Sequence, residues 1–378
     1  MNRKLLFVIN VDWSFLSHRL PIALQAQKAG FDVHIATGIT NKLHIIESYG
    51  IKAHPIRLVR GGWGVLNAIT TFLDLCLIVK QIKPDLMHLV TIKPVLLGGL
   101  VARFMRVRAL VSAVPGLGYV FMTGGLIAWV RRKFVIHLYK FALGHKNQIV
   151  IFQNHDDRDT LMAATGLSVT KVEMIRGSGV DLVKYALSPE PIGVPVVLFP
   201  ARLLADKGIF EFIAAARLLR DKGVVARFVL SGLVDGANPT CVSQPQLTAW
   251  VEEGVVEYWG YRTDMPNVLA NATIVVLPSY REGLPKTLLE AAACGRAVVT
   301  TDVPGCRDAI EPNLTGLLVA VHEVEGLSQA IEQLLSNPKQ REAMGLAARR
   351  LAEQEFDDRD VVKKHLAIYE KLLTWSGR

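Results

Sequence analysis

Two basic side chains stand close together in residues 199–208, which read F-P-A-R-L-L-A-D-K-G. Arg202 and Lys207 follow an apolar run typical of a strand and precede a helical pattern. Cations beside a helix N-terminus can bind a diphosphate, because the free N–H groups and the side-chain charges act on the same anion. The alternative is a solvated loop in which both cations only neutralise neighbouring carboxylates.

Two carboxylates lie further along, in residues 278–295, which read P-S-Y-R-E-G-L-P-K-T-L-L-E-A-A-A-C-G. Glu282 is expected in the loop after a strand and Glu290 on the next helix, with seven residues between them. Gly283 would let the backbone approach a ligand, and Pro285 would start the helix. A helical carboxylate can accept hydrogen bonds from both vicinal hydroxyls of a ribose. In the alternative, Glu282 only complements the helix dipole, whereas Glu290, among apolar neighbours, needs a partner in any case.

The elements that must position these side chains follow a regular alternation along the chain. Short apolar runs alternate with helical patterns, which predicts β-α-β units and parallel sheets. Strands are expected at residues 4–10, 32–37, 52–56, 85–89, 109–113, 148–152, 171–175, 196–200, 227–231, 255–259, 273–277, 297–300 and 316–319. Helices are expected between the strands, for example at residues 17–29, 65–82, 127–143, 208–222, 285–294 and 324–337, and the tail at 339–373 is expected to be helical.

This alternation predicts an α/β protein with two Rossmann-like, doubly wound domains that face each other across a cleft. Residues 1–185 would form the first domain and residues 196–355 the second, with a C-terminal helix over 356–378 that crosses back to the first. Residues 186–195 contain three prolines and one glycine and are expected to be the linker. Neither half has G-x-G-x-x-G after its first strand, which argues against a dinucleotide-dependent oxidoreductase.

Charge is divided unevenly between the two halves. Up to Glu190 there are 23 Lys and Arg against 11 Asp and Glu, whereas the remainder has 20 against 23. Residues 87–155 contain no acidic residue. Phosphates of a lipid surface or of a phospholipid-linked substrate would suit such a stretch, and nucleic acid is the rival partner. At 51% hydrophobic residues, the chain has enough apolar content to exclude a disordered protein.

The remaining composition indicates a cytosolic protein. The four cysteines form no C-x-x-C pair, which is typical of reduced thiols: Cys76, Cys241, Cys294 and Cys306. The N-terminus resembles a first strand more than a signal peptide, because its apolar run is short and meets Asp12. Residues 109–130 carry no charge and are long enough to span a bilayer, but Pro115 and the glycines after it predict a buried strand and a loop.

Residues 125–143, G-L-I-A-W-V-R-R-K-F-V-I-H-L-Y-K-F-A-L, combine aromatic and basic side chains. On a helix, four side chains would share an apolar side beside the cations at 131–133: Trp129, Phe134, Leu138 and Phe141. Aromatic rings and cations suit the headgroup region of an anionic leaflet. We favour membrane contact over an ordinary core helix with a solvated face, because no acidic residue balances the cations.

The Arg…Lys pair followed by two glutamates with seven residues between them resembles the pattern of the family 4 retaining glycosyltransferases. Their fold, termed GT-B, has two Rossmann-like domains. The resemblance covers nearly the whole chain and implies that Arg202 and Lys207 bind the donor diphosphate. It also implies that Glu282 contacts the donor sugar and that Glu290 binds the nucleotide ribose, with Glu282, Arg202 and Lys207 as the catalytic set. The other donor-binding positions that it implies are Gly260, Tyr261, Arg262, Gly283, Leu284 and Pro285.

Five motifs in the first half narrow the resemblance: F-L-S-H-R-L-P (15–21), H-L-V-T-I-K-P (88–94), V-P-G-L-G-Y-V-F (114–121), F-Q-N-H-D-D (152–157) and G-S-G-V-D (177–181). They resemble motifs of bacterial enzymes that extend undecaprenyl-diphosphate-linked sugars in O-antigen, capsule or protein-linked glycans. This implies that the first domain binds the acceptor and faces the membrane. It also implies UDP-N-acetylgalactosamine as donor and an α1,3 linkage, with other UDP-hexoses or GDP-mannose as alternatives. The acceptor-binding residues that follow are His18, His88, Lys93, Gly116, Gly118 and Tyr119.

Two departures from the family pattern concern the first domain. Many relatives have glycines after the first strand, where this chain has residues 11–14, V-D-W-S. Many also carry a histidine after the fifth strand, where this chain has residues 113–116, A-V-P-G. His88 could be a cleft ligand or a packed structural histidine, and His18 could bind the acceptor or cap a helix.

The resemblance implies transfer with retained anomeric configuration, in which Arg202 and Lys207 stabilise the departing diphosphate without a metal or other cofactor. The expected enzyme is cytoplasmic and peripheral on the inner face of the bacterial cytoplasmic membrane. Its expected partners are a nucleoside-diphosphate sugar, a polyprenyl-diphosphate-linked saccharide and an anionic membrane surface, but no nucleic acid. The rivals are a sugar-nucleotide epimerase or phosphorylase, a glycosyltransferase with a soluble acceptor, and a non-catalytic membrane or nucleic-acid binder.

Overall fold

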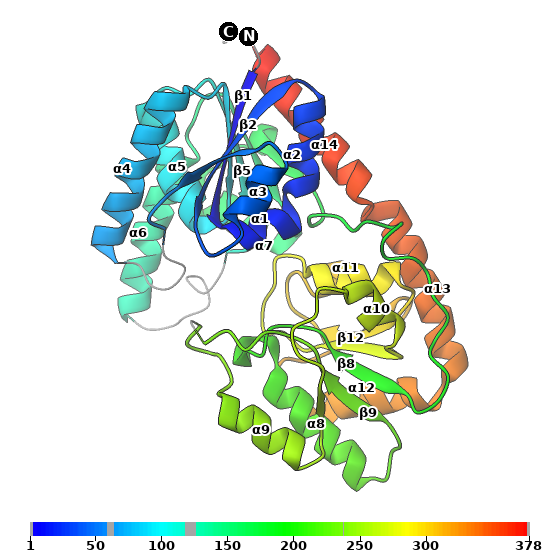
Figure 1. The fold of residues 1–378 in the computed structure, drawn as a ribbon. Helices are drawn as coiled ribbons and strands as arrows, with labels where there is room; N and C mark the ends of the chain where they lie inside the picture. Colours follow the sequence, from blue (N-terminus) through cyan, green and yellow to red (C-terminus); the bar gives the residue numbers. More distant parts are fainter. Residues whose placement is uncertain (1–2, 59–63, 118–125, 237, 376–378) are drawn as a thin grey trace. The chain divides into compact units, whose positions relative to one another are not determined.

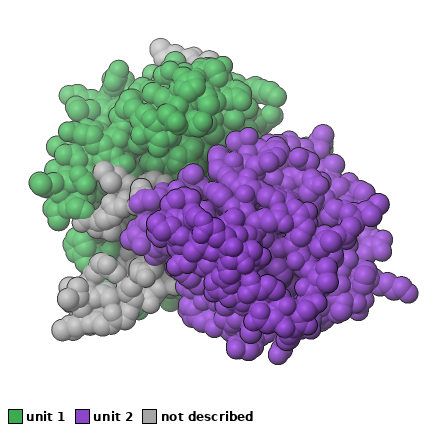
Figure 2. Space-filling model, turned by 60° about the horizontal axis from the view of Figure 1, so that its bottom comes forward, with its two compact units in different colours: residues 1–178, 359–378 green, residues 179–358 purple. Residues whose placement is uncertain are grey.

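The computed structural model describes residues 3–58, 64–117, 126–236 and 238–375 (Figure 1). The chain forms two compact units, coloured separately in Figure 2. Unit 1 comprises residues 1–178 and 359–378, and unit 2 comprises residues 179–358. Each unit is built on one parallel sheet with helices packed against it, which confirms the predicted α/β class with two doubly wound domains.

The sheet of unit 1 has seven strands in the order β3-β2-β1-β4-β5-β6-β7. Every one coincides with a predicted strand: β1 (Arg3–Val11), β2 (Phe31–Gly38), β3 (Lys52–Pro55), β4 (Leu86–Val90), β5 (Ala109–Val114), β6 (Gln148–Phe152) and β7 (Val172–Met174). The order reverses between β1 and β4, which pair in parallel. Ligands of such sheets bind beyond the carboxyl ends of the strands at that reversal.

The helices of unit 1 cover both faces of this sheet. On one face, α4 (Val65–Ile82), α5 (Ile92–Phe104), α6 (Leu126–Ala142) and α7 (His155–Thr165) bury side chains in a single core. On the other lie α1 (Asp12–His18), α2 (Leu20–Lys28), α3 (Leu43–Ser48) and most of the C-terminal α14 (Asp358–Thr374). The helix predicted over 17–29 is two helices that meet at Arg19, because Pro21 in the first turn of α2 has no N–H for a continuous helix.

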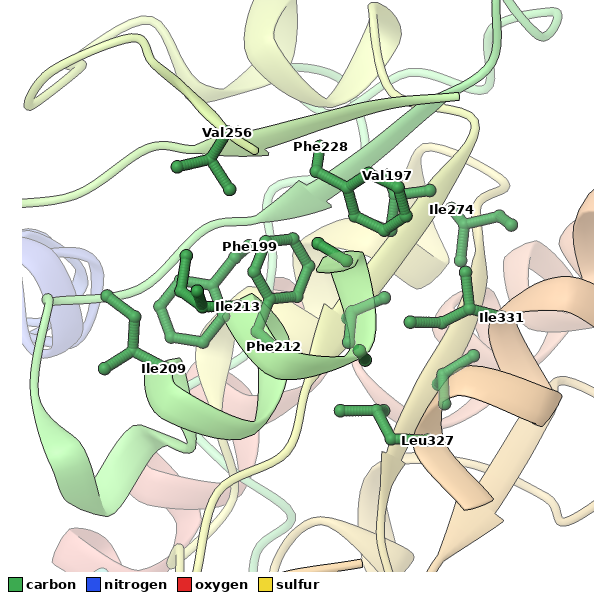
Figure 3. Close-up of a cluster of buried hydrophobic side chains, with 14 of the residues drawn as sticks. Val197, Phe199, Ile209, Phe212, Ile213, Phe228, Val256, Ile274, Leu327 and Ile331 are labelled. Atoms are coloured by element: carbon green, nitrogen blue, oxygen red, sulfur yellow. The ribbon is translucent and has the colours of Figure 1, made fainter. Parts of the chain in front are cut away.

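The sheet of unit 2 has six strands in the order β10-β9-β8-β11-β12-β13, and each coincides with a predicted strand. They are β8 (Val196–Phe199), β9 (Arg227–Leu230), β10 (Glu257–Tyr258), β11 (Ile274–Leu277), β12 (Ala297–Thr301) and β13 (Gly316–Val319). On one face, Phe199, Phe212 and Phe228 form the centre of a hydrophobic core (Figure 3). The helices of this unit are α8 (Ile209–Asp221), α9 (Gln244–Glu252), α10 (Met265–Ala270), α11 (Lys286–Ala293), α12 (Val324–Ser336) and α13 (Pro338–Glu355).

The linker prediction at residues 186–195 does not match the unit boundary. These residues belong to unit 2, and the chain passes between the units after Ser178 and again after Asp358. Arg296, which is buried, donates to Ser188 Oγ and to the Pro189 carbonyl, at 2.5 and 2.9 Å. The Glu190 carboxylate accepts a hydrogen bond from Arg341 Nη2 over 2.8 Å. Arg296 and Arg341 therefore bind a proline-rich segment that its composition alone predicts to be a linker.

Candidate functional site

Lys207 and Glu282 meet at the strand-order reversal of unit 2. Lys207 ends the short 3₁₀ helix after β8, and Glu282 lies in the loop after β11, the parallel neighbour of β8. The Lys207 Nζ forms an ion pair with Glu282 Oε1, and Ser279 Oγ donates to the same oxygen over 2.9 Å. The two side chains are only 19% and 13% exposed, so water screens this pair less than a surface pair.

Arg202 stands in the same loop after β8 but has a different acidic partner. Its Nη1 donates to Asp235 Oδ2 over 2.9 Å, and Asp235 is buried in the loop after β9. Backbone bonds from Leu203 N to the Leu233 carbonyl and from Ala205 N to the Thr240 carbonyl fasten the two loops together. The sequence motifs did not single out Asp235, because only the pairing of the β8 and β9 loops brings it to Arg202.

Glycines allow the loops of this site to approach one another closely. Gly208 has φ +76°, and a Cβ atom there would lie 2.1 Å from the Pro278 carbonyl oxygen. Gly305 has φ +82°, and a Cβ atom there would lie 2.5 Å from the Glu282 carbonyl oxygen. Both positions therefore require glycine for conformation and for space.

Glu290 lies on α11 and is buried, as its apolar neighbours in the sequence predicted. Burial raises the pKa of Glu290 above its ordinary value, although Lys286, 3.9 Å away, and a hydrogen bond from Tyr185 oppose this. Tyr185 comes from the segment after the G-S-G-V-D motif, which sequence analysis did not connect with this glutamate. The carboxylate is thus held in a poorly solvated place where further hydrogen-bond donors would stabilise it.

Gly260, Tyr261 and Arg262 follow β10, two strands away from the reversal. Gly260 accepts a hydrogen bond from Gly232 N over 3.0 Å, which ties this turn to the loop after β9. The Tyr261 ring is exposed, and the Arg262 guanidinium pairs with Asp264 at 2.5 Å. Gly283, Leu284 and Pro285 lie between Glu282 and α11, with Pro285 as the residue before its first turn.

In unit 1, His18 lies beside a residue from another of the five motifs. Its Nδ1 is 3.1 Å from Ser178 Oγ in G-S-G-V-D, so two of these segments meet. Lys93 is in the first turn of α5, directly after β4, and Gly116 follows β5. These residues are therefore near the carboxyl edge of the sheet, whereas Gly118 and Tyr119 lie outside the described residues.

The assignment of His88 to acceptor binding is wrong. Its side chain is 0% exposed and is packed between Phe7 of β1 and two residues of α14, His365 and Tyr369. Its Nδ1 lies 2.6 Å from the Tyr369 hydroxyl. Burial holds the pKa of His88 well below its ordinary value, so it is a neutral structural histidine that fixes α14 to the sheet.

Two further residues lie at this edge of the sheet. The sequence motifs did not single out Thr91, and Asp12 was noted only as part of a segment that departs from the family pattern. Thr91, after β4, has φ 75° and ψ 167°, a conformation that favours glycine. Asp12, in the departing V-D-W-S segment, is buried and accepts hydrogen bonds from Trp13 N, Thr40 and Lys42 N. Burial alone would raise the pKa of Asp12, but these bonds lower it below its ordinary value. The turn in which the family resemblance leads us to expect glycines is thus built here around a carboxylate.

Models of two protein families match the chain, one in each half. Residues 4–154 match the model "Glycosyl transferase 4-like", and residues 188–351 match the model "Glycosyl transferases group 1".

A full-length relative comes from Campylobacter jejuni, the N,N'-diacetylbacillosaminyl-diphospho-undecaprenol alpha-1,3-N-acetylgalactosaminyltransferase. It is 29% identical over 95% of this chain and 98% of its own length. An Escherichia coli UDP-Gal:alpha-D-GlcNAc-diphosphoundecaprenol alpha-1,3-galactosyltransferase is 23% identical over 80% of this chain and 79% of its own. Among solved structures, Anabaena HepE in complex with UDP and glucose superposes with a TM-score of 0.77 at 17% identity, over 98% of this chain and 100% of its own. This last similarity establishes the fold alone.

Replacing Gly208 by alanine tests whether the β8 loop is locked against β11. We expect Gly208→Ala to destabilise the protein by about 2–4 kcal/mol, from the left-handed backbone and the clash with Pro278. The matched control is Gly223→Ala, which has φ +78° but nothing within 4 Å of the added Cβ atom. It should cost only about 1 kcal/mol in thermal unfolding. Equal losses for the two variants would contradict the packing argument.

Replacing Glu290 by glutamine tests the cost of its burial. A raised pKa means that the contribution of Glu290 to stability is complete below the ordinary pKa of a glutamate and is lost as pH rises through the raised value. Glu290→Gln should therefore raise the free energy of unfolding by about 1 kcal/mol at neutral pH, but not at acid pH. Urea unfolding against pH measures this, with the exposed Glu342→Gln as control. Destabilisation at neutral pH would show that the carboxylate is fully satisfied.

Proposed function

Because this chain belongs to the glycosyltransferases, with a 4-like domain followed by a group 1 domain, we propose that it is a retaining enzyme that uses a UDP-sugar. It moves a hexose or N-acetylhexosamine to an undecaprenyl-diphosphate-linked sugar in the assembly of bacterial surface polysaccharide or glycan. The observation that carries the proposal is the meeting of Lys207 and Glu282 at the β8/β11 reversal, with Arg202 in the same loop. UDP-N-acetylgalactosamine and an α1,3 linkage are the specific donor and product, supported by the name of the Campylobacter relative.

The two cations serve the departing diphosphate in this proposal. As the bond to the sugar breaks, negative charge grows on the diphosphate, and positive groups fixed beforehand stabilise it best. In the free protein, Arg202 is matched by Asp235 and Lys207 by Glu282. The diphosphate therefore binds by exchange, with its oxygens replacing carboxylates on cations that are already in place. The N–H groups at the start of α8 add to the same field.

The two glutamates contact the rest of the donor. Once the diphosphate engages Lys207, Glu282 is released to accept hydrogen bonds from hydroxyls of the transferred sugar. Glu290 accepts both ribose hydroxyls, which add hydrogen-bond donors around its buried carboxylate. Lys184 and Tyr185 beside Glu290 would border the ribose, so the segment after the G-S-G-V-D motif takes part in donor binding.

Unit 1 provides the acceptor side. His18, Lys93 and Gly116 are near the carboxyl edge of its sheet, where loops of doubly wound folds bind ligands. The Campylobacter and Escherichia relatives are both named for acceptors linked to undecaprenyl diphosphate, which supports such an acceptor here. We accordingly propose a cytoplasmic, peripheral enzyme on the inner face of the bacterial cytoplasmic membrane, with no nucleic-acid partner.

A panel of nucleotide sugars measured by thermal shift tests the donor. A ligand at 100 times its Kd stabilises the folded protein by about 2.7 kcal/mol, and one that binds more weakly stabilises it less. UDP-N-acetylgalactosamine, as the proposed donor, should therefore raise Tm more than GDP-mannose at the same concentration. Lys207→Ala should abolish this shift and slow transfer by about 100-fold or more, whereas Lys222→Ala, which removes an exposed cation at the end of α8, should do neither. Since the cations replace a metal in the proposal, EDTA should leave the rate unchanged.

Two outcomes would contradict the assignment. Near-normal transfer by Lys207→Ala would remove the cation from the mechanism. Hydrolysis of the donor to a free sugar, or its epimerisation, without any acceptor would favour a sugar-nucleotide epimerase or phosphorylase instead.

A further inference from the structure

An apolar stripe runs along the outward side of α4 in unit 1. Its five side chains are between 50% and 79% exposed and recur at helical spacing: Val65, Leu66, Ile69, Leu73 and Leu77. The opposite side of α4 is buried in the core of unit 1 through Leu75, Ile78 and Val79. The helix is therefore apolar on two sides, of which the fold uses one.

The burial of α4 and the length of its stripe fit a helix that lies in the plane of a membrane better than one that crosses it. Among the described residues, α4 is the one helix whose length and composition would allow it to cross a bilayer. Its inner side is fixed in a protein core, however, so lipid cannot surround it. From Val65 to Leu77 the stripe is about 18 Å long at 1.5 Å per residue, which suits a helix that lies at the headgroup boundary.

The neighbouring helices extend the same surface. Figure 1 shows α4, α5 and α6 side by side, and all three bury their inner sides in one core. Gly99 of α5 lies against Ala142 of α6, where an added Cβ atom would be 2.8 Å from the alanine Cβ. Large aromatic side chains are exposed on this layer at Phe104, Phe134 and Phe141. Exposed apolar side chains are therefore also present on α5 and α6.

The charge of the layer selects the kind of partner. Residues 65–144 contain ten Lys and Arg and two acidic residues. One of these two, Asp74 of α4, accepts both Nε and Nη2 of Arg57, at 3.0 and 2.6 Å. Lys80 of α4 and Lys133 and Lys140 of α6 are exposed on the same helices. An anionic headgroup layer complements such a surface, whereas a second copy of this chain would bring the same positive charge against it.

We propose that the outer stripe of α4, with Phe104, Phe134 and Phe141, is a docking surface that lies in the plane of an anionic lipid bilayer. The sequence indicated membrane contact only for residues 125–143, so the proposal moves the main contact to α4. It deepens the proposed function, because docking presents the carboxyl edge of unit 1 to an acceptor held in the same bilayer. Its test does not require sugar transfer.

Vesicle co-sedimentation of the full chain tests this surface. The probe is phosphatidylcholine vesicles with and without phosphatidylglycerol. We expect binding to the anionic vesicles, and we expect Leu66→Gln/Leu73→Gln to weaken it by about tenfold, since two exposed leucines no longer enter the lipid. The control, Val225→Gln/Leu314→Gln, changes two exposed apolar residues of unit 2 and should bind as the wild type does. Circular dichroism should show that both variants are folded.

Two results would overturn the proposal. In the first, the α4 variant binds anionic vesicles as tightly as the control. In the second, light scattering shows a dimer for the wild type and a monomer for the α4 variant, which would make the stripe a subunit interface.

Transfer to a short-chain, water-soluble diphosphate acceptor separates the docking proposal from the proposed function, because the α4 variant should keep this transfer. Loss of that transfer in the wild type, with vesicle binding intact, would count against the proposed function alone.

Discussion

The ion pair between Lys207 and Glu282 depends on the order of strands in unit 2. The two residues are 75 positions apart in the chain, yet β8 and β11 are parallel neighbours, so their loops leave the sheet at the same edge. A site that stabilises a leaving diphosphate must hold cations in place before the substrate arrives. Cations that are only partly exposed cost free energy unless a carboxylate pairs with them. The acids beside Arg202 and Lys207 therefore stabilise these cations in the free protein, and in the proposed mechanism a diphosphate takes their place.

Other features of the molecule show the same compromise between stability and function. Glu290 is kept in a poorly solvated position that raises its pKa, although a neutral side chain would fit there at lower cost. Thr91 holds a strained backbone conformation at the carboxyl end of β4. The outer side of α4 leaves leucines in water that no part of unit 1 covers among the described residues. For Glu290 and for α4, the proposals assign the compensating contact to a ribose and to a lipid surface.

Much of the fold could be predicted from local patterns, because each strand is a short apolar run and each longer helix has its own periodicity. The positions of Arg202, Lys207 and Glu282 at the reversal follow from those strands and their order. Asp235 could not be predicted, since no motif spacing connects it with Arg202. The linker was misplaced because prolines mark a segment as irregular, but they do not reveal that Arg296 and Arg341 bind it. The role of His88 could not be decided from the sequence, because β4 is buried on both faces. Its apolar neighbours are therefore the same whether the histidine binds a ligand or packs in the core.

The central claim is that Glu282 occupies Lys207 in the free protein and must give way to the diphosphate. Calorimetric titration of UDP into Glu282→Gln tests it most directly, because UDP carries the diphosphate but no sugar for Glu282 to contact. Removing the competing carboxylate should leave UDP bound at least as tightly as in the wild type, while sugar transfer falls sharply. Weaker UDP binding in Glu282→Gln, comparable to that of Lys207→Ala, would contradict the exchange of a carboxylate for a diphosphate.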